Sequence, residues 1–385
     1  MLMIKKAKML QNGEETLLDI LIDEKTISKV GPAIDTPEGA KVIDAKGAYV
    51  TPGLVDAYVY IGVRESEAGS EGKDQDEISG PIQPHVRALD GVNWRDNAFR
   101  YALGGGVTTV ATGPAEANVM GGQGLIININ ENLPEEGVIK EPGSLRIALG
   151  NAPKSTYSEG PKMPSTRMGI AAMVRDHFMR AKEYGENRKK KSKPKFDIVL
   201  DALSTVMKES IPVSFFARRS HDIVTAIRLI KEFDLNGIVA GATEAHMVAD
   251  FLAESKVPVI FIPPLVDKMD PEFRNSTFKT AGILKKAGVE VAIATGAPSP
   301  PAHHLSLMAA LCAKEGLDRQ SAIDAITRVP AELFGLGSKI GCAMPGCIAD
   351  IVVWDGNPLQ LLGAPTLVLA SGQVVFDASK DPKPW

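Results

Sequence analysis

The chain is poor in the residues that most often carry enzyme chemistry. Its 385 residues include only six histidines and three cysteines. Cys312, Cys342 and Cys347 show no zinc-type spacing, and so sparse a set predicts buried free thiols in a reducing compartment. No apolar run approaches the roughly eighteen residues that a membrane helix needs. Met1 to Lys6 leads into an alternating pattern rather than a signal-peptide core, so we expect a cytoplasmic protein that does not enter membranes.

The net charge and the short motifs argue against several further functional classes, namely nucleic-acid binding, membrane-surface binding, serine hydrolysis and phosphate-loop nucleotide binding. The net charge of −4 gives no field that would attract nucleic acid or an anionic membrane. One basic run, residues 188–195, lies in a polar stretch, where a solvated loop is favoured over a binding patch. No G-x-S-x-G nucleophile motif is present, and the glycines at 121–124 lack the lysine and Ser/Thr of a phosphate-binding loop.

The arrangement of apolar residues predicts β-structure at both ends of the chain and α/β-structure between them. At the ends, strand patterns cover residues 16–22, 26–30, 349–354 and 367–376, and a short strand with its turn covers residues 41–47. In the middle, buried-strand patterns at 107–111, 145–149, 212–217, 237–240, 257–261 and 289–295 are separated by helical patterns at 221–233, 245–254, 278–287 and 304–315. This alternation predicts an α/β protein with a (β/α)8 TIM-like barrel and a small β-sandwich built from both chain ends.

Several segments resemble the metal-dependent amidohydrolase superfamily, in the branch of imidazolonepropionase-related and uncharacterised amidohydrolases. Residues 49–62 (YVTPGLVDAYVYIG) are similar to the first barrel strand, V-x-P-G-[LI]-[VI]-D-x-H-x-H, and residues 344–358 (MPGCIADIVVWDGNP) to E-P-G-x-x-A-D-[LI]-V-V-W-D-G-x-P. The resemblance covers nearly the whole chain. It implies a composite β-sandwich at 1–51 plus 335–385 and a barrel at 52–334.

The chain departs from this family wherever the family binds metal. Tyr58 and Tyr60 replace the two histidines of the first strand, and residues 211–223 place Phe216 and Arg218 at further histidine positions. The remaining departures are Gly241 in place of a metal-binding histidine, Gly296 in place of an aspartate that binds metal and acts as general base, and Asn128 where a lysine can form a bridging carbamate.

The replacing side chains do not suit a divalent cation. Neutral tyrosine is a poor zinc ligand, and arginine has five donors and no acceptor. We therefore predict no metal, no cofactor and no catalytic residue of the family type. A relocated metal site made from His85, His221, His246, His303 and His304 is a weaker alternative, because their spacing matches no ligand pair.

These observations predict a degenerate amidohydrolase, a non-catalytic pseudoenzyme subunit that forms a homo- or hetero-oligomer, with an active relative as the expected partner. Two alternatives stay open. One is a hydrolase of non-peptide or dipeptide C–N bonds with a rebuilt site. The other is a carboxylate-binding protein in which Tyr58, Tyr60, Asn128, Arg218 and Arg219 contact the ligand beneath a mobile loop at 64–76, although filling of the vacant cavity is the simpler role for Arg218.

Overall fold

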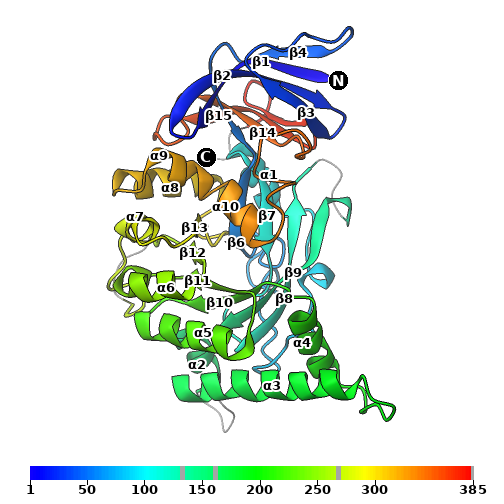
Figure 1. Ribbon diagram of the computed structural model, residues 1–385, viewed down its shortest axis with the longest axis vertical. Coiled ribbons are helices and arrows are strands. Elements are labelled where there is room, and N and C mark those ends of the chain that lie inside the picture. The colour runs from blue at the N-terminus through cyan, green and yellow to red at the C-terminus, as the bar shows by residue number, and fades with distance from the viewer. Residues whose placement is uncertain (131–134, 159–163, 266–269, 383–385) are drawn as a thin grey trace.

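A computed structural model describes residues 1–130, 135–158, 164–265 and 270–382. Strands from the two ends of the chain gather at one end of the molecule, beside a larger α/β module (Figure 1). Among the described residues, no helix is both long and apolar enough to span a bilayer.

Both chain ends join in one eight-stranded sheet. Its order is β16-β15-β14-β5-β1-β2-β3, with β4 paired to β1. The antiparallel pairing of β5 with β14 links the two ends, and a separate hydrophobic cluster that includes Ile4, Ile20 and Leu369 packs beneath it. The strands are β1 (Leu2–Gln11), β2 (Glu14–Asp23), β3 (Thr26–Gly31), β4 (Lys41–Asp44), β5 (Tyr49–Pro52), β14 (Ile351–Asp355), β15 (Ala364–Ala370) and β16 (Gln373–Asp377).

The α/β module contains a second eight-stranded sheet, in the order β13-β12-β11-β10-β9-β8-β7-β6. Its first and last strands approach each other, since the Gly296 N–H donates to the Tyr58 carbonyl at 3.1 Å, so the sheet is a nearly closed, barrel-type one. The strands are β6 (Leu54–Val59), β7 (Val107–Thr112), β8 (Met120–Asn128), β9 (Val138–Ala148), β10 (Val213–Ala217), β11 (Gly237–Gly241), β12 (Val259–Phe261) and β13 (Val291–Ile293).

One strand departs from the parallel pattern that a (β/α)8 barrel requires. β8 runs antiparallel to both β7 and β9. The sequence did not predict this strand because glycines interrupt its apolar pattern. A Cβ at Gly124 would lie 2.6 Å from the Thr112 carbonyl oxygen, so the close approach of the two strands requires glycine there.

Helices α5 to α8 follow one another along one side of the barrel (Figure 1). The predicted helix at 245–254 is divided, because Val248 adopts φ −130° and ψ 28° between a 3-10 turn and α6. The helices are α1 (Asn97–Gly104), α2 (Asn151–Tyr157), α3 (Arg167–Asn187), α4 (Ile198–Lys208), α5 (Ser220–Phe233), α6 (Ala249–Ser255), α7 (Lys279–Lys286), α8 (Leu305–Lys314), α9 (Arg319–Asp324) and α10 (Arg328–Leu333); 3-10 turns cover Ala88–Asp90, Glu135–Gly137, Ala245–Val248 and Ala302–His304.

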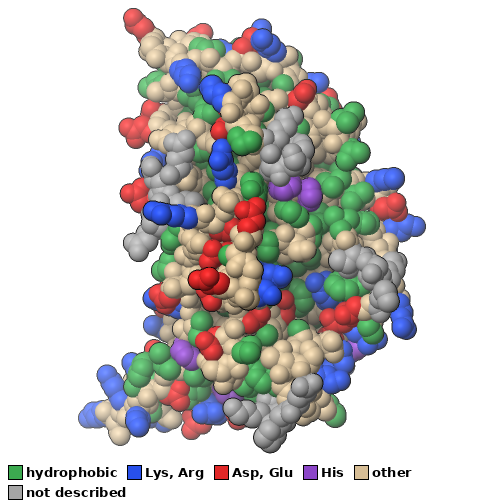
Figure 2. All heavy atoms as spheres, turned by 180° about the vertical axis from the view of Figure 1, so that it is seen from behind, with side chains coloured by type: hydrophobic (Ala, Val, Ile, Leu, Met, Phe, Trp, Pro, Cys, Tyr) green, Lys and Arg blue, Asp and Glu red, His purple; other side chains and the backbone are tan. Residues whose placement is uncertain are grey.

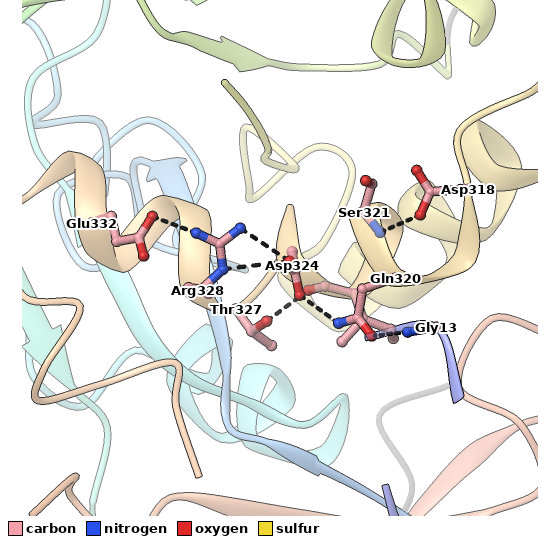
Figure 3. Close-up of polar contacts among 9 residues, drawn as sticks. Gly13, Asp318, Gln320, Ser321, Asp324, Thr327, Arg328 and Glu332 are labelled. Atoms are coloured by element: carbon pink, nitrogen blue, oxygen red, sulfur yellow. Dashed lines mark hydrogen bonds and ion pairs between the residues drawn. The ribbon is translucent and has the colours of Figure 1, made fainter. Parts of the chain in front are cut away.

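A polar network joins the terminal sheet to the barrel helices (Figure 3). Gln320 of α9 accepts a hydrogen bond from the Gly13 N–H in the β1–β2 turn at 3.2 Å and donates to Asp324 at 2.7 Å. Arg328 of α10 then bridges Asp324 at 3.0 Å and Glu332 at 2.7 Å. The hairpin turn is thereby tied to two consecutive helices.

The prediction of three free thiols is wrong for two of them. Cys342 and Cys347 form a disulfide, with their Cα atoms 6.2 Å apart. The turn between them brings together two residues only five apart in sequence, a relation that zinc-type spacing rules do not detect. Cys312 is free and buried, and burial raises its pKa to about 12, so this thiol stays protonated at neutral pH.

Candidate functional site

Two tyrosines end the first barrel strand. Tyr58 lies in β6 and Tyr60 directly follows it, and both side chains are buried, with 1% and 8% of their surface exposed. Alternation along a strand would place residues 58 and 60 on the same face. Their rings meet edge to face, with centroids 5.8 Å apart. The structure therefore brings together the two residues that the sequence placed at the first metal-ligand pair.

Both phenols donate to one carboxylate. The Tyr58 hydroxyl lies 3.2 Å from Glu116 Oε1, and the Tyr60 hydroxyl donates to the same oxygen. Glu116 lies beyond the end of β7. Burial raises the pKa of Glu116, and burial together with the Glu116 charge raises the pKa of both tyrosines well above their usual value. The phenols thus remain protonated at neutral pH and act as donors to Glu116.

An arginine from β9 completes this cluster. The Arg146 side chain is buried, and its guanidinium donates to the carbonyl oxygens of Val59, Ala111, Gly113 and Pro114 at 2.8 to 3.1 Å. The guanidinium carbon lies 3.9 Å from the centroid of the Tyr58 ring. This cation–π contact, added to four hydrogen bonds, fixes a permanent positive charge beside the tyrosines.

Phe216 fills the space on the other side of Tyr58. Its ring centroid lies 5.7 Å from that of Tyr58. Gly241, at the end of the neighbouring strand, has φ +83°, and a Cβ there would lie 3.1 Å from the Phe216 ring. Gly296 has φ +71°, and a Cβ there would lie 3.3 Å from Ile262. Neither glycine position therefore accepts a larger side chain without local strain.

Arg218 contacts two aromatic rings. Its guanidinium carbon is 4.8 Å from the Phe216 centroid and 4.4 Å from the Phe273 centroid, and Nη1 donates to Thr243 at 3.3 Å. The side chain is partly exposed. Because arginine carries five N–H donors, a single hydrogen bond leaves most of them for a ligand or for water. Arg219, the N-cap of α5, interacts electrostatically with Glu244.

One predicted pocket residue lies elsewhere. Asn128 is buried and donates to Asp350 at 2.6 Å and to Thr109 at 3.3 Å, and Ser371 donates to its side-chain oxygen at 3.1 Å. Asp350 and Ser371 belong to the terminal module, so Asn128 joins that module to the barrel and makes no polar contact with the tyrosines. Alignment to the family lysine placed it in the pocket, but its hydrogen bonds place it at this junction.

The loop predicted to be mobile is held down over the tyrosines. Arg64 N–H donates to the Tyr60 carbonyl at 2.7 Å, and the carboxylate of Asp76 accepts from the Ala117 N–H at 2.9 Å. Asn118 donates to the Glu77 carbonyl at 2.7 Å. The prediction of mobility rested on the polar composition of the loop, which gives no information about these hydrogen bonds with the segment between β7 and β8 that carries Glu116.

The metal ion that the family resemblance implies does not fit these residues. The phenol oxygens are engaged with Glu116, Arg146 places a fixed cation against Tyr58, and Gly241 and Gly296 offer no side-chain donor. A divalent ion would need several unengaged carboxylate, imidazole or thiolate donors. Within the described parts of the chain, no three His, Cys, Asp or Glu side chains are arranged to hold a metal ion.

Sequence reasoning missed two central residues of the cluster. Arg146 is a charged residue inside an otherwise apolar strand pattern at 145–149, and a buried charge there is a usable signal. Glu116 follows strand β7, at the strand end where barrel enzymes place their functional residues. Neither residue stands at a position where the family resemblance expects a metal ligand.

Comparison with known proteins agrees with the barrel-type fold. The model of the amidohydrolase family matches residues 175–380, and a crystal structure of an amidohydrolase from Thermotoga maritima is 35% identical, with a TM-score of 0.93 over 98% of this chain and 100% of that one. This chain belongs to the amidohydrolase family. Amidohydrolase tasK of Hapsidospora irregularis is 27% identical over 93% of this chain, and the imidazolonepropionase of Cupriavidus taiwanensis is 26% identical over 89% of this chain and 85% of its own length. The match spans only 40% of the length of tasK.

Proposed function

We propose that this amidohydrolase-family chain is a metal-free, non-catalytic subunit that acts beside an active relative. The observation that carries the proposal is the Arg146 guanidinium, held by four backbone carbonyls against the ring of Tyr58. Metal hydrolases lower the pKa of bound water from about 15.7 to about 7. At about 1.36 kcal/mol per unit, loss of that activation costs about 12 kcal/mol, which the tyrosines and arginines do not replace.

A longer relative supports the association. The segment similar to this chain makes up 40% of tasK, so in that amidohydrolase the same unit is one part of a longer polypeptide. A subunit that lacks its own metal ligands fits such an arrangement, because it retains the scaffold and the association surfaces while another unit supplies the chemistry.

Untagged purification from the native host in about 0.5 M salt tests the pairing, since this ionic strength screens weak surface attraction. We expect a second amidohydrolase chain to co-purify in fixed stoichiometry, with hydrolase activity following that partner. Recovery of this chain without any such partner would contradict the association.

Arg218 favours a second candidate function, the binding of a small carboxylated molecule. The rings of Phe216 and Phe273 contact its guanidinium, and Thr243 accepts a hydrogen bond from one of its five donors. A guanidinium held in this way can bind a carboxylate through two parallel hydrogen bonds. A thermal-shift screen with mono- and dicarboxylates should find a stabilising ligand whose effect is lost in Arg218→Ala and retained in Arg228→Ala, a change at an exposed arginine of α5. Equal stabilisation of both variants would exclude Arg218 as the contact.

Glu116 favours the rebuilt hydrolase more weakly. Burial raises the pKa of this carboxyl, and a carboxyl with a raised pKa beside two phenol donors can move protons. A panel of amides, lactams and dipeptides tests this candidate. Turnover that disappears in Glu116→Gln would support it, and turnover that survives this substitution would assign the activity to another site or to a contaminant.

We also propose the division of the chain into residues 1–51 plus 335–385 and residues 52–334. In support, β5 ends at Pro52 and α10 ends at Leu333, close to both proposed boundaries. Limited proteolysis should produce fragments that keep the 52–334 unit intact. Cleavage first within a barrel strand would contradict these boundaries.

A further inference from the structure

Two exposed segments of opposite charge stand out on the surface. The first, here called the basic segment, is residues 188–195 between α3 and α4; one arginine and five lysines give it a formal charge of +6, and all six are exposed. It projects beyond the end of α3 (Figure 1), and basic side chains gather at that end of the molecule (Figure 2).

The second, here called the acidic segment, is residues 65–77. Six carboxylates and one lysine give it a formal charge of −5. Glu67, Glu71, Asp74 and Glu77 are exposed. Near its two ends, the Ser66 N–H donates to Asp96 at 3.1 Å and Asp76 accepts from the Ala117 N–H at 2.9 Å, so its charges are held in place before any partner arrives.

Each charged segment is followed by exposed apolar side chains. Phe196 and Ile198 follow the basic segment and are 61% and 53% exposed, and Ile78 follows the acidic segment and is 61% exposed. The two surfaces therefore match in charge and in the apolar contact at their ends. Such pairing of a charged area with an adjacent apolar anchor is typical of interaction surfaces.

The basic and the acidic segment form no ion pair with each other within the described part of one molecule. Both are fully described, and none of the ion pairs found among the described residues joins them. The basic segment's one ion pair, from Arg188 to Asp201 at 3.6 Å, leaves its lysines without a carboxylate partner.

We propose that the basic segment of one copy docks on the acidic segment of a second copy. Because the two surfaces differ, the contact is heterologous, and repeated use builds a ring or an open chain of copies. The docked segment lies over the barrel mouth of its neighbour and restricts access to the cluster around Glu116. This association uses only residues on the outer surface. It therefore does not depend on whether the barrel mouth is catalytic, or on which relative the chain pairs with.

Three charge variants of the full chain test the contact. Lys191, Lys193 and Lys195→Glu neutralises the basic segment, and Glu71 and Asp74→Lys leaves the acidic segment near neutral. Lys25, Lys29 and Lys41→Glu changes the net charge as much as the first variant but lies in the terminal module, at exposed lysines. Sedimentation velocity in about 50 mM salt should show oligomers of the parent chain and of the terminal-module variant, and monomers of the other two.

Mixing the two monomeric variants gives the sharper result. The first keeps an intact acidic segment and the second an intact basic segment, so one contact can form and the assembly should stop at a 1:1 dimer. Raising the salt to about 500 mM should raise the apparent dissociation constant at least about tenfold, because the Debye length falls from over 10 Å to about 4 Å.

Several outcomes would overturn the proposal. They are a parent chain that is monomeric at low salt, self-association that the segment variants leave unchanged, and a mixture that stays monomeric. Vesicles with anionic lipid and a short duplex DNA serve as further probes. Binding of either by a monomeric parent chain, with loss in the first variant, would assign the basic segment to a different partner and reject self-docking.

Discussion

The hydroxyl of Tyr60 donates a hydrogen bond to the carboxylate of Glu116 inside the barrel. A buried phenol needs a hydrogen-bond acceptor, and a buried carboxylate needs a donor. Each of the two residues supplies what the other needs, which explains how both can be buried. In the resemblance to the family, Tyr58 and Tyr60 stand where metal-binding histidines are expected; here both hydroxyls donate to Glu116.

Replacement of Tyr60 by phenylalanine tests this relationship. We expect Tyr60→Phe to lower the free energy of unfolding by about 1 to 3 kcal/mol, because Glu116 loses a donor in a buried site. Urea unfolding at pH 7 measures the change. Tyr101→Phe is the matched control, since the Tyr101 hydroxyl donates to exposed Glu67 at 3.3 Å and its loss should cost under about 0.5 kcal/mol. Equal losses in the two variants would show that the buried contact adds nothing.

A histidine at position 241, where the family resemblance expects a metal ligand, should destabilise the fold. Gly241→His must place a Cβ 3.1 Å from the Phe216 ring in a backbone with φ +83°, so we expect a loss of about 2 to 4 kcal/mol. Adding Phe216→Ala should recover part of the loss beyond additivity in a double-mutant cycle. Strictly additive losses would mean that the ring is not the obstacle.

Asp56 should make stability fall as pH rises. This carboxyl is fully buried, and burial raises its pKa to about 7 from an ordinary value of 3.8. A raised folded-state pKa means that the protonated form is the one that stabilises the fold. The contribution is complete below about pH 4 and is lost as pH rises through about 7. Thermal unfolding across this range should show a smaller decline for Asp56→Asn than for the parent chain. Parallel curves would contradict the assignment.

Substitution of Asn128 should lower stability without affecting ligand binding, and substitution of Arg218 should mainly weaken binding. Asn128→Ala removes the donor to buried Asp350, so we expect a loss of about 1 to 3 kcal/mol with no change in the affinity for any carboxylate that the screen identifies. Arg218→Ala should weaken that binding with a smaller loss of stability. Calorimetric titration of both variants measures the difference, and weakened binding in Asn128→Ala would return Asn128 to the pocket.

The sequence predicts the architecture well because the architecture follows from periodic apolar patterns. Five of the six predicted buried strands and the helices at 221–233, 278–287 and 304–315 are found within a few residues of their predicted bounds, whereas the strand predicted at 145–149 begins earlier, at Val138. β8 was missed because Gly121, Gly122 and Gly124 remove the apolar alternation.

The site was only partly predictable, for a physical reason. Tyr58 of β6 and Phe216 of β10 lie against each other although their strands are four places apart in the sheet order, and Gly241 lies beside Phe216 on the neighbouring strand β11. The partners of the tyrosines come from the segment after β7, which carries Glu116, and from the C-terminal end of β9, which carries Arg146. No local sequence pattern predicts which buried charged residue will lie against which strand end. These contacts could therefore be identified only from the three-dimensional structure.

Element-sensitive mass spectrometry of untagged protein, purified without chelators, tests the central claim most directly. The account predicts zinc, manganese, iron and nickel all well below one equivalent per chain, with the same traces in a variant that carries Tyr58→Phe and Tyr60→Phe. About one equivalent of any of these metals in the parent chain, lost in that double variant, would place an ion at the barrel mouth and contradict the account.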